Sequence, residues 1–181
     1  MRFLVTTGLT REYLDSVRFL SNGSTGATGF RIAEEAARRG GDVVVIAGTV
    51  SAAPPAGLEV ISVVSAAEMC DAVLSRLSSF DVLIGAAAVC DWQPAHRAPR
   101  KLAKLDGLEV RWVPPPAIRE LAGAQQGSRL HIGFALEDAE GLSNAARKLA
   151  RKNLDYIVLN SPEAIGSRGG SYQLLSRGGG M

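Results

Sequence analysis

The chain has 181 residues, of which 46% are hydrophobic and 21% charged, and its formal net charge is +2. This length and composition predict one soluble globular domain over residues 1–181 with a well-buried core. The small net charge and the aromatic content of 6% supply neither the basic field nor the stacking surface typical of nucleic-acid binding, so we expect no nucleic-acid partner.

The apolar runs are too short to cross a bilayer. Even 82–89 is far below the roughly 20 residues that a transmembrane helix needs. Met1 leads directly into the strand-like Arg2–Thr7, which leaves no room for a signal peptide. We therefore expect a cytoplasmic protein with no membrane partner, in which Cys70 and Cys90 are buried and reduced.

Strand-like and helix-like segments alternate along the chain. In the first half the pattern predicts strands over 2–7, 42–48, 58–64 and 81–89, and helices over 25–39 and 66–77. In the second half it predicts strands over 108–113, 130–135, 156–159 and 172–175, and helices over 117–122 and 142–152. This order predicts an α/β, Rossmann-like, doubly wound fold with a mostly parallel sheet and helices on both faces.

Two segments differ from this alternation. Leu108–Val113 alternates apolar with polar residues around Trp112, which predicts an edge strand and an interface for a homodimer. Residues 160–171 are rich in Gly, Ser and charge, and we expect a mobile flap there within a partly flexible tail over 160–181.

The segment Asp15–Gly29 contains glycines spaced three apart and leads into a helix. Gly23, Gly26 and Gly29 allow a ligand to approach the backbone, and the first N–H groups of the helix favour phosphate or carboxylate. The segment therefore predicts an anion-binding turn. The alternative is that these glycines serve only tight turns and helix packing.

Small and polar residues occupy the end of the predicted strand at 81–89 and the positions just after it. Ala86–Ala88 leave room for a planar ring, and Asp91 can bind its polar edge or its ribose, because ligands of parallel sheets bind at the carboxyl ends of strands. The alternative is that the alanines serve packing and that Asp91 caps a helix. Beyond them, Arg97–Lys104 carries four cations, which are either a solvated face or a site that neutralises a triphosphate.

Two other classes of site are disfavoured. His96 and His131 have no metal-ligand neighbours at suitable spacing, so we assign no metal site. The second strand ends Ile46–Thr49 without the acidic residue that binds a ribose hydroxyl, and a catalytic Tyr-x-x-x-Lys pair is missing. A NAD-dependent oxidoreductase is therefore disfavoured.

Together these residues resemble phosphopantothenoylcysteine synthetase (phosphopantothenate–cysteine ligase), the ligase domain of the bifunctional coenzyme A biosynthesis flavoprotein family. The resemblance spans nearly the whole chain. It rests on Thr10–Glu12, Asp15–Gly29, Ala86–Pro94, Lys101–Lys104, Gly133–Glu137 and Lys148–Asn160.

The resemblance implies that CTP or ATP, with Mg²⁺, activates 4′-phosphopantothenate as an acyl-nucleotide, from which cysteine displaces the nucleotide. It implies that Lys101 serves activation, that Asn22 holds the acyl intermediate and that Arg18 binds the acyl substrate. The nucleotide-binding residues that it implies are Gly8, Ser24, Gly26, Gly29, Ala86, Ala87, Asp91, Lys101, Lys104 and Phe134. It also implies a homodimer, and we expect no flavin in this chain.

The sequence departs from the family pattern near the expected site. Pro114–Ile118 stands where the family has K-N-P-D-I, and Gly26–Gly29 lacks the lysine of the family's G-K-M-G. Smaller departures are Leu9, Ala103 and Asp138. These changes leave a second interpretation open, in which the chain is a diverged nucleotide-binding homologue with another carboxylate substrate or no catalysis.

Overall fold

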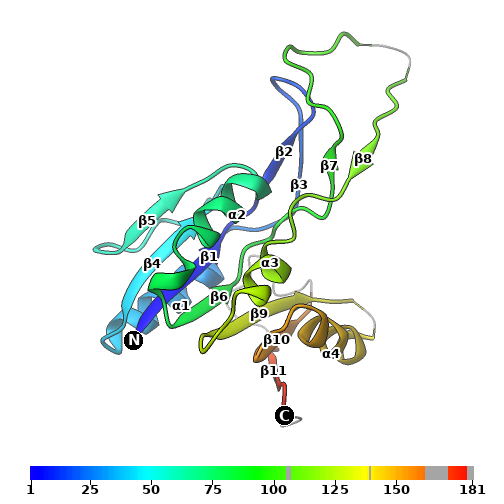
Figure 1. Cartoon of the computed structure of the whole chain (residues 1–181). Coiled ribbons are helices and arrows are strands. Elements are labelled where there is room, and N and C mark those ends of the chain that lie inside the picture. The colour runs from blue at the N-terminus through cyan, green and yellow to red at the C-terminus, as the bar shows by residue number, and fades with distance from the viewer. Residues whose placement is uncertain (105–106, 139, 162–170, 179–181) are drawn as a thin grey trace.

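In the computed structural model, which describes residues 1–104, 107–138, 140–161 and 171–178, a seven-stranded sheet forms the centre of the molecule (Figure 1). The strand order is β11-β10-β9-β6-β1-β4-β5, and every neighbouring pair is parallel except β10 with β11. The strands are β1 (Arg2–Thr7), β4 (Asp42–Ala47), β5 (Glu59–Ser62), β6 (Val82–Gly85), β9 (Leu130–Leu136), β10 (Tyr156–Asn160) and β11 (Gln173–Ser176).

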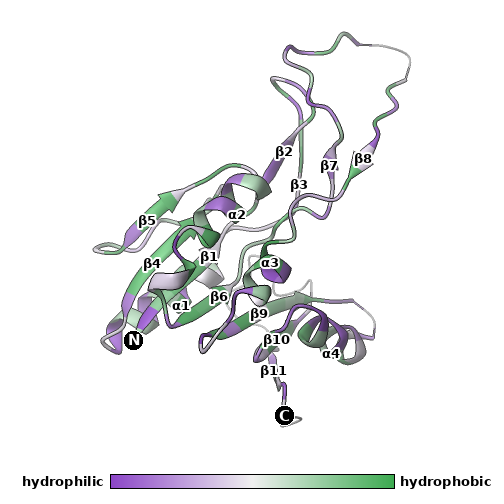
Figure 2. Ribbon diagram, viewed as in Figure 1, coloured by the Kyte–Doolittle hydropathy of each residue, from purple (hydrophilic) through white to green (hydrophobic). Residues whose placement is uncertain are grey.

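Helices cover both faces of the sheet, as the sequence predicts. On one face α1 (Ala27–Arg38) packs against Val5 and Val45. On the other face, α2 (Ala66–Leu74) and α3 (Ile118–Ala124) pack against Leu4 and Ile46. Leu4 and Ile46 are the strand neighbours of Val5 and Val45, and successive residues of a strand point to opposite faces of the sheet. On that second face α4 (Gly141–Arg151) covers Ala135 and Ile157 of β9 and β10. The central strands are accordingly hydrophobic along their length (Figure 2).

The helix ends follow from local chemistry. Ser65 caps α2, because its hydroxyl accepts a hydrogen bond from the Glu68 N–H at 3.2 Å. The Glu12 carboxylate, which is buried, accepts another from the Ala66 N–H at 2.8 Å. A short 3₁₀ turn, Leu77–Ser79, then returns the chain to β6, so the predicted helix over 66–77 ends as α-helix three residues earlier.

An arm projects from the sheet and corrects two expectations. Its described residues are 11–21, 92–104 and 107–113, and it contains β2 (Arg11–Tyr13), β3 (Phe19–Ser21), β7 (Gln93–Pro94) and β8 (Trp112–Val113), as Figure 1 shows. β2 and β3 form an antiparallel hairpin, and β3 lies inside the predicted anion-binding segment Asp15–Gly29, where the sequence indicated only a turn. The predicted strand over 108–113 is formed only at its last two residues, where it pairs with β7.

The third correction concerns the strand predicted over 81–89, which ends at Gly85. The Ala86 N–H still bonds the Thr6 carbonyl oxygen at 3.1 Å, and the Ala88 N–H bonds that of Gly8 at 2.8 Å. The chain therefore leaves the sheet while remaining beside the end of β1. This path carries Ala86–Asp91 over the carboxyl edge of the sheet.

The structure also bears on the expectations for the cysteines, the flap and membrane spans. Cys70 and Cys90 are free and buried, as expected, and burial raises the pKa of both thiols. Most of the predicted flap over 160–171 lies outside the described residues. None of the helices among the described residues combines the length and apolar character that crossing a bilayer requires.

Candidate active site

A cleft of about 720 Å³ opens at the carboxyl ends of β1, β6 and β9. The chain reverses its direction of winding between β1 and β6, since β4 and β5 lie on one side of β1 and β6 on the other. Crevices at such switch points are where open α/β sheets bind ligands. A second hollow, of about 780 Å³, lies beside α1. Its lining is mainly apolar, with side chains such as Phe3 and Ile32, so we place the chemistry in the more polar cleft.

The glycine turn forms one wall of the cleft. Gly26 is the N-cap of α1 with a φ of 81°, a conformation that favours glycine, and α1 has no acidic residue in its first turn and no side-chain cap. Gly29 lies so close to Thr7 that a Cβ there would clash with its side chain. The Thr7 hydroxyl donates to the Gly26 carbonyl oxygen at 2.8 Å. These contacts hold the positive end of the α1 dipole against the cleft.

The segment after β6 forms the second wall. Ala87 is buried and its N–H lies 3.4 Å from the Thr6 hydroxyl oxygen, whereas the Asp91 side chain is exposed. Asn22, at the end of β3, donates from its amide nitrogen to the Val89 carbonyl oxygen at 3.0 Å. The predicted residues Asn22 and Asp91 therefore meet at one cleft, although they are far apart in the sequence.

Cationic residues of α4 form a third wall that the sequence interpretation did not assign to the site. Lys148, Arg151 and Lys152 all line the cleft. Lys148 pairs with Glu137, and Arg151 pairs with Glu120 at 3.3 Å. Among the described residues, Lys152 has no such partner, and burial together with the charges of Arg119, Arg151 and Lys148 lowers its pKa to about 8.

Arg119, at the start of α3, lies on the floor of the cleft. Gly85 and Gly133 are paired across β6 and β9 and both face α3. A Cβ at Gly85 would come within 3.2 Å of Arg119 Nε, and one at Gly133 within 3.4 Å of Nη1. The guanidinium therefore lies on a floor of two paired glycines, and Nη1 donates to the Phe134 carbonyl oxygen at 2.9 Å.

The cleft brings together most of the predicted nucleotide-binding residues. Its lining includes Asn22, Ser24, Gly26, Gly29, Ala86, Ala87, Asp91 and Phe134. Gly8 is not part of the lining; with a φ of 77° it packs against Thr49 and Val50 beneath the turn. Pro114–Ala117, which replaces the family's K-N-P-D, borders the same cleft.

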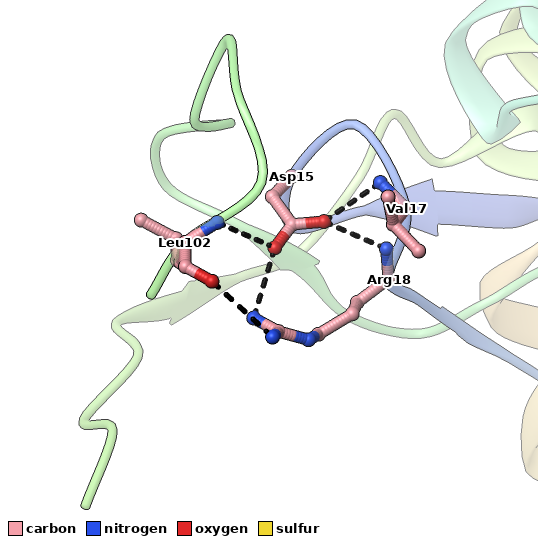
Figure 3. Close-up of polar contacts among 4 residues, drawn as sticks. All are labelled: Asp15, Val17, Arg18 and Leu102. Carbon is pink, nitrogen blue, oxygen red and sulfur yellow. Dashed lines mark hydrogen bonds and ion pairs between the residues drawn. The ribbon is translucent and has the colours of Figure 1, made fainter. Parts of the chain in front are cut away.

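The other predicted residues, Arg18, Lys101 and Lys104, lie in the arm and outside the cleft lining. Arg18 Nη1 lies 3.0 Å from Asp15 Oδ2, and Nη2 donates to the Leu102 carbonyl oxygen at 3.3 Å (Figure 3). The Asp15 carboxylate also accepts the N–H groups of Val17, Arg18 and Leu102. The arm therefore holds Lys101 beside Arg18, with both lysine side chains exposed.

These bonds explain the chemistry of Asp15. Its side chain is fully buried in the arm, and the backbone N–H of Arg18 is the largest of several contacts that lower the pKa of the carboxyl to about 2. Asp15 is consequently ionised at every physiological pH. The sequence offered one sign of this role, which is an acidic residue followed three positions later by an arginine.

Among the described residues, no group of three or more His, Cys, Asp or Glu side chains is placed to hold a metal ion. His131 is buried in β9, on the face that α2, α3 and α4 cover. Asp91 and Glu120 are the carboxylates in the described lining of the cleft, and Glu120 is already paired with Arg151. The arrangement is therefore suited to binding an anion through backbone N–H groups and cations.

Comparison with known proteins places this architecture in a family. The model of the DNA/pantothenate metabolism flavoprotein C-terminal domain matches residues 1–177. The chain belongs to this family. Its members include proteins named coenzyme A biosynthesis bifunctional protein CoaBC, from Borreliella burgdorferi (35% identical over 171 residues, 92% of this chain and 44% of the relative) and Bacillus subtilis (42% identical over 168 residues, 91% and 41%).

A solved structure agrees with this membership. The crystal structure of the C-terminal domain of a CoaBC protein is 31% identical to this chain, with a TM-score of 0.85, and covers 99% of this chain and 83% of that domain. The chain spans less than half the length of the curated relatives that it matches. The family and the α/β fold are thus established, and the sequence resemblance to the ligase domain is confirmed.

Proposed function

We propose that this chain is a phosphopantothenate–cysteine ligase of coenzyme A biosynthesis that uses CTP or ATP. The observation that carries the proposal is the convergence of Asn22, the Gly23–Gly29 turn and Ala86–Asp91 on one cleft at the switch point of the sheet. These segments are the ones that carry the resemblance to the family. Relatives that contain this domain are named for coenzyme A biosynthesis.

The reaction has two steps. A carboxylate oxygen of 4′-phosphopantothenate attacks the α-phosphorus of the triphosphate, and pyrophosphate leaves. The cysteine amine then attacks the acyl carbon, an amide bond forms, the nucleoside monophosphate leaves with the electron pair of the acyl–oxygen bond, and the amine loses a proton. Both steps need positioned cations and N–H donors more than they need a protein nucleophile.

In this proposal, different walls of the cleft bind different parts of the ligand. The glycine turn and the N-terminus of α1 bind phosphate, while Ala86, Ala87 and Asp91 bind the nucleoside, with the Phe134 backbone near the base. Asn22 holds the acyl intermediate. Mg²⁺ prefers oxygen ligands, and with few free carboxylates in the described cleft lining it enters bound to the triphosphate.

Lys101 and Arg18 are not in the described lining of the cleft of their own chain. Both lie in the arm, which exposes six apolar side chains: Val17, Phe19, Leu20, Trp92, Leu108 and Trp112. A surface of this kind is typical of an interface, and two-fold pairing of identical arms covers it in both copies. We propose a homodimer in which Lys101 of the partner subunit reaches the cleft and serves carboxylate activation.

The test is pyrophosphate release with 4′-phosphopantothenate, cysteine, Mg²⁺ and either CTP or ATP. Release that depends on the acid and disappears in both Asn22→Ala and Lys101→Ala supports the ligase. Mixing these two inactive variants tests the shared site, because half of randomly formed dimers are mixed and each mixed dimer has one intact site. We expect recovery of about a quarter of the wild-type rate; no recovery contradicts the contribution from the partner.

The second candidate is a diverged nucleotide-binding homologue with another carboxylate substrate or no catalysis. It is favoured by Pro114–Ala117, which lines the cleft without the charged side chains of the family pattern. Nucleotide binding without pyrophosphate release from 4′-phosphopantothenate supports this candidate. We further propose that the described residues act as one domain in the cytoplasm, where nucleoside triphosphates are available.

A further inference from the structure

Arg119 is the feature of the cleft that the proposed function leaves unused. Its guanidinium has five N–H donors. Among the described residues it makes one hydrogen bond, from Nη1 to the Phe134 carbonyl oxygen at 2.9 Å, and no ion pair. The acidic neighbour Glu120 pairs with Arg151 instead. The remaining donors of Arg119 are therefore available to a ligand in the cleft that it lines.

The surroundings fix the guanidinium. The Arg119 guanidinium lies against Gly85 and Gly133, which are paired across β6 and β9 and have no side chains. A methyl group added at either glycine would lie within 3.4 Å of a guanidinium nitrogen. The hydrogen bond to Phe134 sets its rotation on that floor. A planar donor group held in this manner presents its free N–H groups in a constant direction, as recognition of a flat ligand edge requires.

The position of Arg119 corresponds to the base of a bound nucleotide. The glycine turn to which we assign phosphate follows β1, whereas Arg119 lies against Gly85, the last residue of β6, and Gly133, the middle residue of β9. Since neighbouring strands are about 4.8 Å apart, β9 lies about 10 Å from β1, which is the span from a phosphate group to its base. Asp91 lines the same cleft and forms no ion pair with Arg119 in the part of the chain that the structure describes.

We propose that Arg119 selects the nucleobase by donating two hydrogen bonds to a base edge with two adjacent acceptors, and this inference rests on the proposed function. Cytosine presents such an edge with O2 and N3. Uracil has the same size but carries a proton on N3, which opposes a donor, and adenine places the N6 amino group beside N7. Guanine has adjacent acceptors in O6 and N7. Of the two nucleotides in the proposed function, Arg119 therefore selects CTP over ATP.

The experiment is calorimetric titration of the intact chain, in the absence of acid substrate and cysteine, with the magnesium complexes of CTP, UTP, ATP and GTP. We expect CTP to bind roughly tenfold or more tightly than UTP and ATP, the range of one bidentate arginine–base contact. In Arg119→Lys, which keeps the charge but has no planar pair of donors, we expect the CTP:UTP ratio to fall to about twofold.

Three controls separate base selection from other effects. Inorganic triphosphate has no base, so its affinity should be the same in the wild type and in Arg119→Lys. Arg129→Lys alters an arginine that donates to backbone carbonyls of Gln125 and Gln126 outside the cleft, and should leave all ratios unchanged. Arg119→Gln, with its thermal unfolding recorded, repeats the test if the lysine variant is unstable.

The outcomes are distinct. Weakening of CTP alone, or of CTP and GTP together, in Arg119→Lys supports the assignment. Equal binding of CTP and UTP by the wild type, or an unchanged ratio in the variants, overturns it and leaves the ligase proposal in place. A wild-type chain that binds none of the four nucleotides overturns the proposed function and the assignment together.

Discussion

Arg18 contacts the buried Asp15 at 3.0 Å and the Leu102 carbonyl oxygen at 3.3 Å, which joins the β2–β3 hairpin to the loop that carries Lys101. Leu102 returns a hydrogen bond through its N–H to Asp15. Two backbone segments of the arm, the turn at Val17 and Arg18 and the loop at Leu102, are thus fixed around one carboxylate. The position of Lys101 therefore depends on Asp15, a residue that is not itself in the described lining of the cleft.

We predict that Asp15→Asn loosens the arm. The amide group of asparagine would place N–H donors against Arg18 and the Leu102 N–H, which are donors themselves. The melting temperature should fall by several degrees, and the Leu102 amide should exchange faster in hydrogen-exchange measurements. Asp42→Asn is the matched control, because the Arg2–Asp42 pair is exposed and contributes little. An unchanged exchange rate at Leu102 would contradict the role of Asp15.

The interface in the arm is tested by Val17→Asp. The Val17 side chain is 56% exposed at the tip of the hairpin, so a charge there leaves the fold of one chain intact but is buried when two arms meet. Sedimentation should show a shift from dimer to a species of 19.0 kDa. Val64→Asp introduces the same charge at an exposed valine outside the arm and should leave the dimer unchanged. A wild-type chain that sediments only as monomer excludes the interface.

Gly85→Ala should alter base selection while leaving the Arg119 side chain itself unchanged. The added methyl lies 3.2 Å from Arg119 Nε and displaces the guanidinium from its floor. We expect CTP affinity to fall by roughly tenfold while inorganic triphosphate binds as before. Gly178→Ala, with no atom within 4 Å of the added Cβ and no positive φ, controls for substitution of a glycine. Retention of full CTP preference would show that the floor does not position Arg119.

Triphosphate binding should weaken as the pH rises above about 8. Burial and three neighbouring cations lower the pKa of Lys152 to about 8, so the free chain loses this charge in mildly alkaline solution. An anionic ligand favours the protonated form, and binding near pH 8 should therefore take up protons. Titration in buffers of different ionisation enthalpy measures that uptake. Lys152→Arg keeps its charge and should give affinities that are flat between pH 7 and 10.

His131 makes stability depend on acidity. Among the described residues, neither ring nitrogen has a hydrogen-bond partner, and burial lowers the pKa of the ring below 6.5 despite the favourable charge of Asp155; Arg129 and Arg177 lower it further. As the pH falls below 6.5, His131 therefore binds a proton more readily in the unfolded chain than in the folded one. The free energy of unfolding consequently decreases, by at most about 1.4 kcal/mol per pH unit. Unfolding by urea at several pH values measures this slope.

The control variants are His131→Phe and His96→Phe. Replacing the buried ring by an apolar one of similar size should remove the loss of stability below pH 6.5. Replacing the exposed His96 should leave the slope as it is. If His131→Phe unfolds with the same pH dependence as the wild type, other groups account for it.

The sequence predicted the sheet well because its strands are buried on both faces. β4 and β6 are almost entirely apolar and β1 has an apolar centre, so each is recognised as a buried strand, and Gly26 and Gly29 identified the turn into α1. The sequence did not predict the β2–β3 hairpin, because each strand has only three residues. The hairpin is stabilised by the hydrogen bonds of Asp15 and by the contact between the Tyr13 and Phe19 rings. Such contacts have no periodic pattern.

Arg119 could not be predicted for a different reason. Its place depends on the register that pairs Gly85 with Gly133, and register between distant strands is not visible in one sequence. The same holds for the wall formed by α4, since the sequence shows a basic helix but not the face that it turns to the cleft. The sequence therefore identified two of the segments that line the cleft, Asn22–Gly29 and Ala86–Asp91, whereas Arg119 and the α4 wall required the tertiary structure.

The central place of β1 in the sheet also determines the order of assembly. β1 lies between β4 and β6, which both follow it in the chain, and the floor of the cleft needs β9, which comes much later. Folding therefore depends on contacts between distant segments and is expected to be slow relative to that of a helical protein of this size. Until β6 is made, one edge of β1 stays open, and the nascent chain is exposed to mispairing at that edge.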